Sequence, residues 1–366
     1  MRDVCSPGVY SAHRVNLQLL WYDVVSGQAG AWAAPLRWIL SGAEAGYRIG
    51  LDRRNRRLED PLSRVRLDVP VISVGNITTG GTGKTPFVIH LAQRLVQLGR
   101  RPGVVSRGYK APADQPNEEQ LLIEKSCPEA ICIAEADRVT GARAASDRGA
   151  NVILLDDGFQ HRRLERDVDI VLIDATCPFG FERLLPRGLL REPISALGRA
   201  ALIVITRVDQ ILAPELTRIE RRIADAAPQA AVVRSSHRVT RVRTLNGRDC
   251  NEPLSGRRAY LTAALGNPRS FLTTTKSLGI EVTGWKWWPD HHRYRASEVR
   301  SLLRQALQGP QDVLVTTAKD AVKLERLDGL PRDRIWVIEV AIDLPASAAT
   351  MLDQTLRKGA GLACDS

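Results

Sequence analysis

The sequence predicts an α/β protein with a parallel sheet covered by helices on both faces, followed by a second, smaller α/β lobe. Three observations lead to this fold class. Short apolar runs alternate with helical stretches between residues 67 and 235. A glycine-rich loop lies between one such run and a helix start at residues 76–85. Near residue 235 the pattern changes, and residues 237–244 alternate like a connecting β ribbon.

The first predicted region, residues 1–66, is a helical element at a membrane surface. Aromatic and small apolar side chains precede a group of arginines here: Trp21, Tyr22, Trp32 and Trp38, then Arg53, Arg54, Arg56 and Arg57. The longest uncharged run, residues 24–36, is shorter than the ~20 residues that cross a bilayer, so spanning is disfavoured. An interfacial helix is one interpretation, and a helix pair packed on the protein body is the other.

The second predicted region, residues 67–235, begins with a strand at residue 71 and the loop Asn76-Ile-Thr-Thr-Gly-Gly-Thr-Gly-Lys-Thr85. Its Gly-Lys-Thr end is typical of a P-loop, whose backbone N–H groups surround phosphate oxygens while the lysine reaches the β and γ phosphates. We therefore predict a P-loop NTPase-like sheet that binds ATP through Thr78, Thr79, Gly80, Gly81, Thr82, Gly83, Lys84 and Thr85. Thr78 stands where the strict motif has glycine, so a purely structural turn is the alternative.

Further elements of this region follow in order. We expect a helix at residues 86–98 and strands at residues 103–106, 130–134, 152–155, 170–173 and 200–205. The apolar run 151–155 ends in Asp156 and Asp157, which places carboxylates at the carboxyl edge of a parallel strand beside the loop. With the Thr85 hydroxyl, either aspartate can hold Mg²⁺, an ion that prefers oxygen ligands. Capping of the next turn is the alternative role.

The third predicted region, residues 236–366, contains the ribbon and a second α/β lobe. Strands are expected at residues 259–263, 313–316 and 335–340, and helices at 268–278 and 296–307.

Composition narrows the possible partners. The 366-residue chain has a formal net charge of +11, which favours anionic ligands without distinguishing nucleic acid, membrane surface and phosphorylated small molecules. Its six cysteines are scattered without a C-x-x-C pair, so a disulfide framework or zinc site is not expected.

Several separated motifs together resemble the tetraacyldisaccharide 4'-kinase family. The matching stretches are Val74-Gly-Asn-Ile-Thr-Thr-Gly-Gly-Thr-Gly-Lys-Thr-Pro86, Ser106-Arg-Gly-Tyr109, Asp156-Asp-Gly-Phe-Gln-His161, Arg166-Asp167, Leu185-Pro186 with Leu190-Arg-Glu-Pro193, Gly266-Asn-Pro268, Asp290-His291 and Lys319-Asp-Ala-Val-Lys323. They span nearly the whole chain in order. The resemblance implies transfer of the ATP γ-phosphate, with Mg²⁺, to the 4'-hydroxyl of an acylated glucosamine disaccharide 1-phosphate, giving lipid IVA in lipid A biosynthesis. It also implies a peripheral or monotopic protein at the cytoplasmic face of an inner membrane, which we expect to be a monomer.

The resemblance also assigns roles to residues. Lys84 and Asp157 are expected to be catalytic, and Asn76 to contact the substrate. Arg187 and Arg191 lie in one loop and are expected to bind the substrate 1-phosphate or to stabilise charge on the moving phosphoryl group, although the family commonly has a small residue at position 187. Salt bridges on a surface loop are the alternative for both arginines. The family places an aspartate base in a Gly-Asp-Glu-Pro motif, where this chain has Asn117-Glu-Glu-Gln120. Glu118 would then replace that base, with His291 as its partner across the cleft. Solvated charges at a helix start are the other interpretation of Glu118.

Two other classes of protein compete with a kinase. One is a P-loop GTPase or ATPase switch of the metallochaperone type, because Thr206-Arg-Val-Asp209 faintly resembles a guanine-binding loop. That segment lacks the Asn and Lys of such loops, and no Cys or His cluster is present to carry metal. The other is a nucleic-acid binder, which the absence of a recognisable binding motif disfavours. We therefore expect an anionic membrane surface, and no nucleic acid, among the partners.

Overall fold

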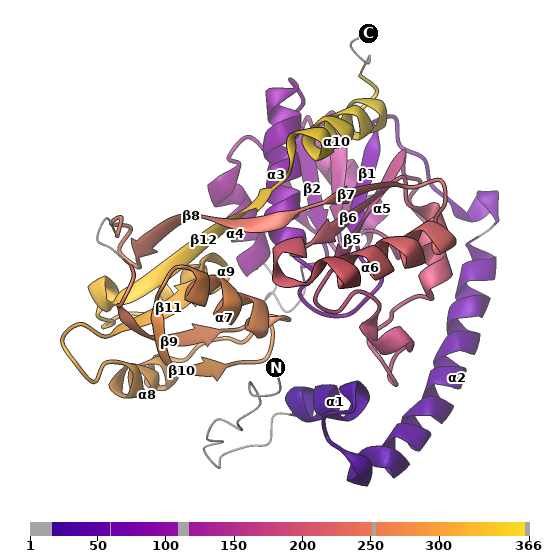
Figure 1. The fold of residues 1–366 in the computed structure, drawn as a ribbon. Coiled ribbons are helices and arrows are strands. Elements are labelled where there is room, and N and C mark those ends of the chain that lie inside the picture. Colours follow the sequence, from indigo (N-terminus) through magenta and orange to yellow (C-terminus); the bar gives the residue numbers. More distant parts are fainter. Residues whose placement is uncertain (1–16, 59, 109–116, 251–253, 363–366) are drawn as a thin grey trace.

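The computed structural model describes residues 17–58, 60–108, 117–250 and 254–362. It contains a seven-stranded sheet with its helices, a five-stranded sheet with its own helices, and a pair of helices at the N-terminal side (Figure 1). The predicted fold class, a P-loop NTPase-like parallel sheet joined to a smaller α/β lobe, is confirmed.

The seven-stranded sheet forms the first lobe. All of its strand pairs are parallel, in the order β3-β2-β4-β1-β5-β6-β7. The strands are β1 (Val71–Gly75), β2 (Pro102–Ser106), β3 (Ile131–Ala134), β4 (Val152–Asp156), β5 (Val168–Asp174), β6 (Leu202–Thr206) and β7 (Ala231–Arg234). Every residue of β1, β2, β4 and β6 is buried, as expected for parallel strands covered on both faces. The sequence predicted six of these strands and missed β7.

Helices cover both faces of this sheet. They are α3 (Lys84–Gln97), α4 (Glu118–Ser126), α5 (Arg138–Asp147), α6 (Ala213–Ala226) and α10 (Ala346–Gly359). On one face Leu91 of α3 and Leu356 of α10 join the same apolar cluster, and on the other Ile223 of α6 packs with Ile203. The predicted helix 86–98 is thus α3. The last helix, although it lies within the predicted third region, packs on the first lobe because its apolar side covers this sheet.

The second lobe is built on a sheet of order β10-β9-β11-β12-β8, in which only β8 is antiparallel. Its elements are β8 (Ser236–Thr244), β9 (Arg258–Ala263), α7 (Pro268–Ser277), β10 (Glu281–Trp287), α8 (Ala296–Ala306), β11 (Val313–Thr317), α9 (Ala318–Leu324) and β12 (Ile335–Asp343). Apart from β10 and α9, the sequence predicted each of these elements.

The connection between the lobes is a two-stranded ribbon of β8 and β12 (Figure 1). The predicted ribbon strand 237–244 is therefore confirmed as β8. At one end of the ribbon Ile342 belongs to the apolar core of the first lobe, and toward the other end Ile338 belongs to the core of the second. The chain thus enters the second lobe along β8 and leaves it along β12.

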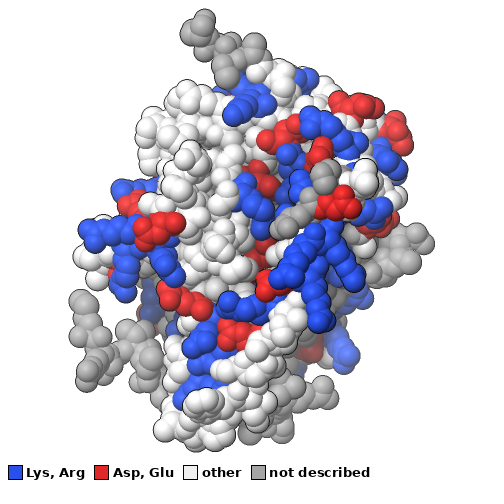
Figure 2. Space-filling view, turned by 90° about the vertical axis from the view of Figure 1, so that its right-hand side faces the viewer, with Lys and Arg blue, Asp and Glu red and all other residues white. Residues whose placement is uncertain are grey.

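The N-terminal helices are α1 (Leu17–Ser26) and α2 (Ala34–Arg57), and α2 runs along one side of the molecule (Figure 1). Large apolar side chains are exposed here, among them Trp32 at 66%, Trp38 at 80% and Ile39 at 69%. Within the described residues, no helix combines the length and apolar character needed to cross a membrane. Figure 2 shows the side on the right of Figure 1, where Lys and Arg side chains gather in groups with Asp and Glu between them.

Short 3-10 helices occupy the remaining connections: η1 (Ala31–Ala33), η2 (Pro61–Ser63), η3 (Gly180–Glu182), η4 (Ile194–Arg199), η5 (Val208–Gln210) and η6 (Arg332–Arg334). The predicted domain boundaries remain predictions, and residues 1–16 of the predicted N-terminal region lie outside the described part of the chain.

Candidate active site

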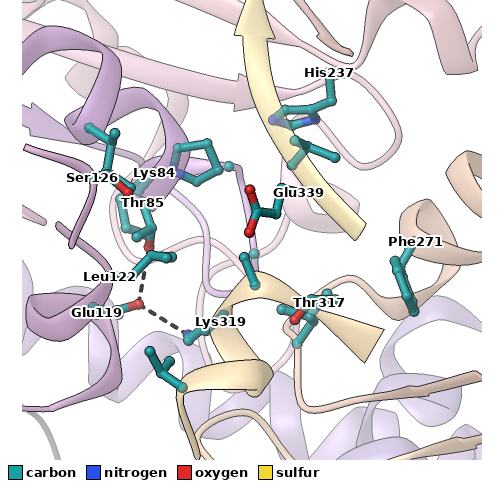
Figure 3. Close-up of a pocket in the computed structure, with 18 of the residues that line it drawn as sticks. Lys84, Thr85, Glu119, Leu122, Ser126, His237, Phe271, Thr317, Lys319 and Glu339 are labelled. Carbon is teal, nitrogen blue, oxygen red and sulfur yellow. Dashed lines mark hydrogen bonds and ion pairs between the residues drawn. The ribbon is translucent and has the colours of Figure 1, made fainter. Parts of the chain in front are cut away.

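A cleft of about 1260 Å³ lies between the two lobes and extends along the ribbon. From the first lobe it is lined by residues 78–85, the start of α4 and the end of β4, and from the second by residues 265–267, 290–291 and 317–319. Figure 3 shows Lys84, Thr85 and Glu119 on one side of this space and Thr317 and Lys319 on the other. The predicted loop and several predicted residues of the second lobe therefore line one cavity.

The loop after β1 has the backbone form that an anion site needs. Gly80 and Gly83 both have positive φ, and Gly83 directly precedes α3, so the N-terminus of this helix opens into the cleft. Thr78, which stands in place of a glycine, forms an antiparallel bridge with Leu190 and has no left-handed backbone. A side chain is therefore tolerated there, and the departure from the strict motif leaves the loop intact.

The second lobe contacts this loop directly. A Cβ atom on Gly266 would overlap the backbone of Gly80 and Gly81, so only glycine permits this approach. The next residue, Asn267, caps α7 and donates from its amide to Asp174 of the first lobe at 2.9 Å. The Gly266-Asn-Pro268 motif is thus the point where the second lobe meets the phosphate-binding loop.

Lys84 lies in a small group of charges beneath the loop. Its Nζ donates to the side-chain oxygen Oδ1 of Asn76 at 3.1 Å and forms an ion pair with Asp157 at 3.4 Å. Arg191 holds the same Asp157 carboxylate at 2.7 Å. Asn76 is fully buried, also donates to the carbonyl of Thr78, and does not line the cleft. This position differs from the predicted substrate contact, because the Asn76 side chain serves the loop itself.

The two consecutive aspartates have opposite electrostatic environments. Burial, followed by the negative charge of Glu119, raises the pKa of Asp156 to about 7. Burial also acts to raise the pKa of Asp157, but the charges of Lys84 and Arg191 outweigh it and hold that pKa well below its usual range. The Asp157 carboxylate is paired with Lys84 and Arg191, whereas one buried carboxylate oxygen of Asp156 has no hydrogen-bond partner.

Thr85 and Glu119 complete a group of oxygen atoms near Asp156. The Thr85 hydroxyl donates to Glu119 at 3.3 Å (Figure 3). Among the described residues, no three His, Cys, Asp or Glu side chains cluster closely enough to hold a metal by themselves. Mg²⁺ needs only one or two carboxylates when phosphates and water supply the rest, so the Thr85 hydroxyl and the carboxylates of Asp156 and Glu119 fit this ion. The sequence analysis did not identify Glu119 as a site residue. Its position next to Glu118 is the one feature of the sequence that could have indicated it.

Glu118 and His291 form a contact between the two lobes, and His291 lines the cleft. Asn117 caps α4, so Glu118 is the first residue of this helix, and its carboxylate lies 2.6 Å from Nδ1 of His291. Burial acts to raise the pKa of Glu118, but the hydrogen bond with His291 and the charges of Lys323 and Lys319 outweigh it and lower that pKa to about 2. The Glu118 side chain is only 14% exposed, so the alternative of a solvated surface charge is wrong.

A second connection between the lobes runs through Lys319. Its Nζ lies 3.1 Å from Glu119 of the first lobe and 3.2 Å from Asp290 of its own lobe. Burial acts to lower the pKa of Lys319, but the surrounding carboxylates, led by Glu119, outweigh it and raise that pKa above its usual value. Lys319 therefore stays charged and ties the start of α4 to the second lobe.

Arg187 and Arg191 lie on one loop but at different sites. Arg191 lines the cleft, whereas Arg187 lies outside it and donates to the carbonyl of Val25 in α1 at 3.4 Å. Burial and the charges of Arg183 and Arg37 lower the pKa of Arg187. The structure therefore brings only Arg191 next to the phosphate-binding loop.

Fold and cleft together define a P-loop kinase, with a nucleotide loop in one lobe and an acid–histidine pair formed between the two. Residues 36–357 match the family model described as Tetraacyldisaccharide-1-P 4'-kinase. The chain belongs to this family, which confirms the resemblance.

Individual relatives of this chain belong to the same family. Tetraacyldisaccharide 4'-kinase of Anaeromyxobacter sp. (strain K) is 38% identical over 90% of this chain and 92% of its own length. The enzyme of Syntrophus aciditrophicus is 39% identical over 81% of this chain and 87% of its own. Among solved structures, the "apo" form of LpxK from Aquifex aeolicus in complex with ATP matches with a TM-score of 0.68 and 26% identity, covering 89% of this chain and 99% of that chain.

Proposed function

We propose that this protein transfers the γ-phosphate of ATP to the 4'-hydroxyl of a tetraacyldisaccharide 1-phosphate, giving lipid IVA for lipid A biosynthesis. The observation that carries the proposal is the Glu118–His291 pair, 2.6 Å apart, whose imidazole lines the same cleft as Lys84. A proton acceptor opposite a phosphate-binding loop is what a kinase with an alcohol substrate requires. Family membership supplies the identity of that alcohol.

The first lobe binds the nucleotide in this proposal. Backbone N–H groups of residues 78–85 and the start of α3 contact the phosphates, and Lys84 contacts the transferred group. Asp157 keeps Lys84 and Arg191 in place, so two cations face the γ-phosphate. Thr85 and Asp156, together with Glu119, would hold Mg²⁺, which when bound neutralises charge on the phosphates.

Glu118 is the proposed base. Its pKa of about 2 keeps it charged at neutral pH, and the contact with His291 fixes its orientation. As the 4'-oxygen forms its bond to the γ-phosphorus, the hydroxyl proton passes to the carboxylate–imidazole pair. The bond from that phosphorus to the β–γ bridging oxygen breaks, and ADP leaves. Asp290, 3.6 Å from Nε2 of the imidazole, positions the ring from the other side.

The N-terminal helices are attached to the loop that carries Arg191. Trp21 donates to the carbonyl of Pro186 at 2.9 Å, Tyr47 donates to the carbonyl of Arg191 at 2.9 Å, and Glu44 accepts from the backbone of Leu184 at 2.8 Å. The aromatic residues exposed on these helices suit the headgroup region of a membrane.

We infer from these contacts that the helices lie on the cytoplasmic face of the inner membrane as a peripheral or monotopic anchor. A lipid substrate would then pass from the anionic membrane surface along the 184–191 loop, where Arg187 is placed to contact its headgroup. One chain supplies both sides of the cleft, so we expect the enzyme to act as a monomer.

The reaction itself is the decisive test. Purified protein in detergent is incubated with Mg²⁺, ATP and tetraacyldisaccharide 1-phosphate, and the bisphosphorylated product is measured. Parallel reactions contain GTP in place of ATP, or no acceptor lipid. Product that depends on ATP and acceptor supports the kinase, whereas GTP hydrolysis without product would instead indicate the switch class of protein.

A further inference from the structure

A second cavity, of about 320 Å³, shares no lining residue with the cleft. It opens between the segment that precedes β1, the segment between β4 and β5, and η4. Five arginines line it: Arg64, Arg66, Arg162, Arg166 and Arg199. Only two carboxylates, Glu165 and Asp169, share the space. The cavity is therefore strongly positive.

The two carboxylates are already used by particular arginines. Asp169 accepts both donors of a bidentate pair from Arg166, at 3.0 and 3.2 Å, and both side chains are about nine-tenths buried. Glu165 lies 3.4 Å from Arg66. Arg166 is part of the Arg166-Asp167 motif, for which the kinase reaction offers no role. This pair forms a rigid wall of the cavity.

The remaining arginines have unused donors. Arg199 donates from Nη1 to the buried Glu192 at 2.8 Å and from Nη2 to the carbonyl of Phe159 at 3.5 Å, and each of these nitrogens carries a second N–H; its Nε is buried without a partner. Arg64 donates only from Nε, to the carbonyl of Leu58, among the described contacts. Their guanidinium groups therefore face the cavity with donors to spare.

Arg162 is the least compensated of the five. No hydrogen bond or ion pair joins it to any other residue in the described part of the chain. Burial, followed by the charges of Arg199 and Arg64, lowers the pKa of Arg162, so like charges act on it at close range. Such a cluster is unfavourable unless an anion occupies it, and guanidinium groups match the geometry of phosphate oxygens.

We propose that this cavity binds a phosphate group, at a site separate from the nucleotide loop, with Arg162, Arg64 and Arg199 as its ligands. The phosphate is either a free anion or the headgroup of an acidic lipid, because the same guanidinium donors recognise both. Arg199 pairs with Glu192, which directly follows Arg191 in the chain. The proposed phosphate site is therefore connected to the loop that carries Arg191 into the cleft.

The test compares two neighbouring arginines. Arg162→Gln removes the proposed ligand, and Arg163→Gln is the matched control, since Arg163 is exposed, pairs with Asp137 at 3.1 Å and does not line the cavity. Each full-length protein is first saturated with Mg²⁺ and a non-hydrolysable ATP analogue, so that the nucleotide loop is occupied. Inorganic phosphate is then titrated by calorimetry, and binding to phosphatidylcholine vesicles with or without phosphatidic acid is measured by sedimentation.

We expect Arg162→Gln to weaken phosphate binding in at least one arm by about tenfold, as for loss of a charge-assisted hydrogen bond, while Arg163→Gln stays close to wild type. An effect on inorganic phosphate identifies a free anion as a sufficient ligand. An effect confined to phosphatidic acid vesicles identifies the lipid headgroup. Arg64→Gln, at an exposed position, repeats the test with little risk to folding, and equal melting temperatures confirm that each variant is folded. Equal behaviour of Arg162→Gln and Arg163→Gln in both arms would overturn the proposal.

Discussion

The two lobes contribute to the cleft in different ways. The anion site of the first lobe is one continuous segment, residues 78–85, formed by its backbone and glycines. The second lobe contributes single side chains from separate elements: His291 and Lys319 line the cleft, and Lys323 lies behind them, 3.6 Å from Glu118. All three reach the start of α4 in the first lobe. Nucleotide binding is therefore a property of one lobe, whereas the proposed base is completed only when the two lobes meet.

This comparison predicts which substitutions affect binding and which affect chemistry. Residues of the phosphate-binding loop should alter both, because they contact ATP in every state. Residues that join the lobes should alter the chemical step and leave nucleotide affinity nearly unchanged.

The largest effect is expected for Lys84→Ala. It removes the cation on the transferred phosphate and leaves Asp157 with Arg191 alone, so turnover should fall by roughly 10³-fold or more. Product formation with saturating ATP measures this loss. Lys276→Ala, at an exposed position of α7, is the control and should retain normal activity. Substantial turnover by Lys84→Ala would break the assignment of the nucleotide to the first lobe.

Glu118→Gln should reduce kcat by roughly 10²- to 10⁴-fold, because the amide cannot accept the hydroxyl proton. The dissociation constant for ATP, measured by calorimetry, should stay close to the wild-type value. Glu119→Gln sharpens the comparison, since it should raise the Mg²⁺ concentration needed for half-maximal activity instead. Full activity of Glu118→Gln would place the base elsewhere.

A smaller effect is expected when the ion pair between the lobes is removed. Lys319→Met leaves Glu119 and Asp290 without their shared cation, and kcat should fall by roughly 10- to 100-fold through loss of alignment. Lys319→Arg should recover part of this activity. Steady-state kinetics with both substrates would show the effect, and an unchanged kcat in Lys319→Met would indicate that the lobes align without this contact.

The smallest effect is expected for the pH dependence of stability, through His237 in the ribbon. His237 of β8 packs against Gly83 of the loop, and burial, followed by the charge of Arg207, lowers its pKa to about 3. The unfolded chain takes up a proton near pH 6.5, but the folded protein does so only near pH 3. The stability contributed by neutral His237 is thus present above pH 6.5 and is lost as the pH falls toward 3, by up to about 1.4 kcal/mol per pH unit.

Urea unfolding at several pH values tests this relation. His237→Gln should make the free energy of unfolding between pH 6.5 and 4 less dependent on pH than in wild type. His90→Gln is the comparison variant, because His90 lies outside the contact between the lobes. An identical pH dependence in His237→Gln and wild type would contradict the role given to His237.

The sequence predicted most of the fold because the central strands are short, wholly apolar and separated by helices. The two strands it missed, β7 and β10, are edge strands of their sheets. Four of the seven residues of β10 are exposed and Gly284 interrupts the strand, so its composition lacks the strong apolar pattern of a buried strand. The sequence analysis also did not predict α10, the helix that returns to the first lobe.

The candidate site divides in the same way. Local motifs located the phosphate-binding loop and the double aspartate, since each is set by a strand and the turn that follows it. The resemblance to the family supplied Glu118 and His291, which are 173 residues apart. Glu119 and the buried position of Asn76 depend on how α4 and the loop pack against β4, and such tertiary contacts leave no local pattern in the sequence.

The return of the chain to the first lobe has a consequence for biosynthesis. Leu352 and Leu356 of α10 fill the apolar core beneath the seven-stranded sheet, so one face of that sheet is incompletely covered until α10 has been made. A ribosome that stalls anywhere within the second lobe would release a chain with an uncovered sheet face, open to quality-control proteases. The cell would thereby avoid accumulating a half-made protein that holds ATP but has no partner lobe to use it.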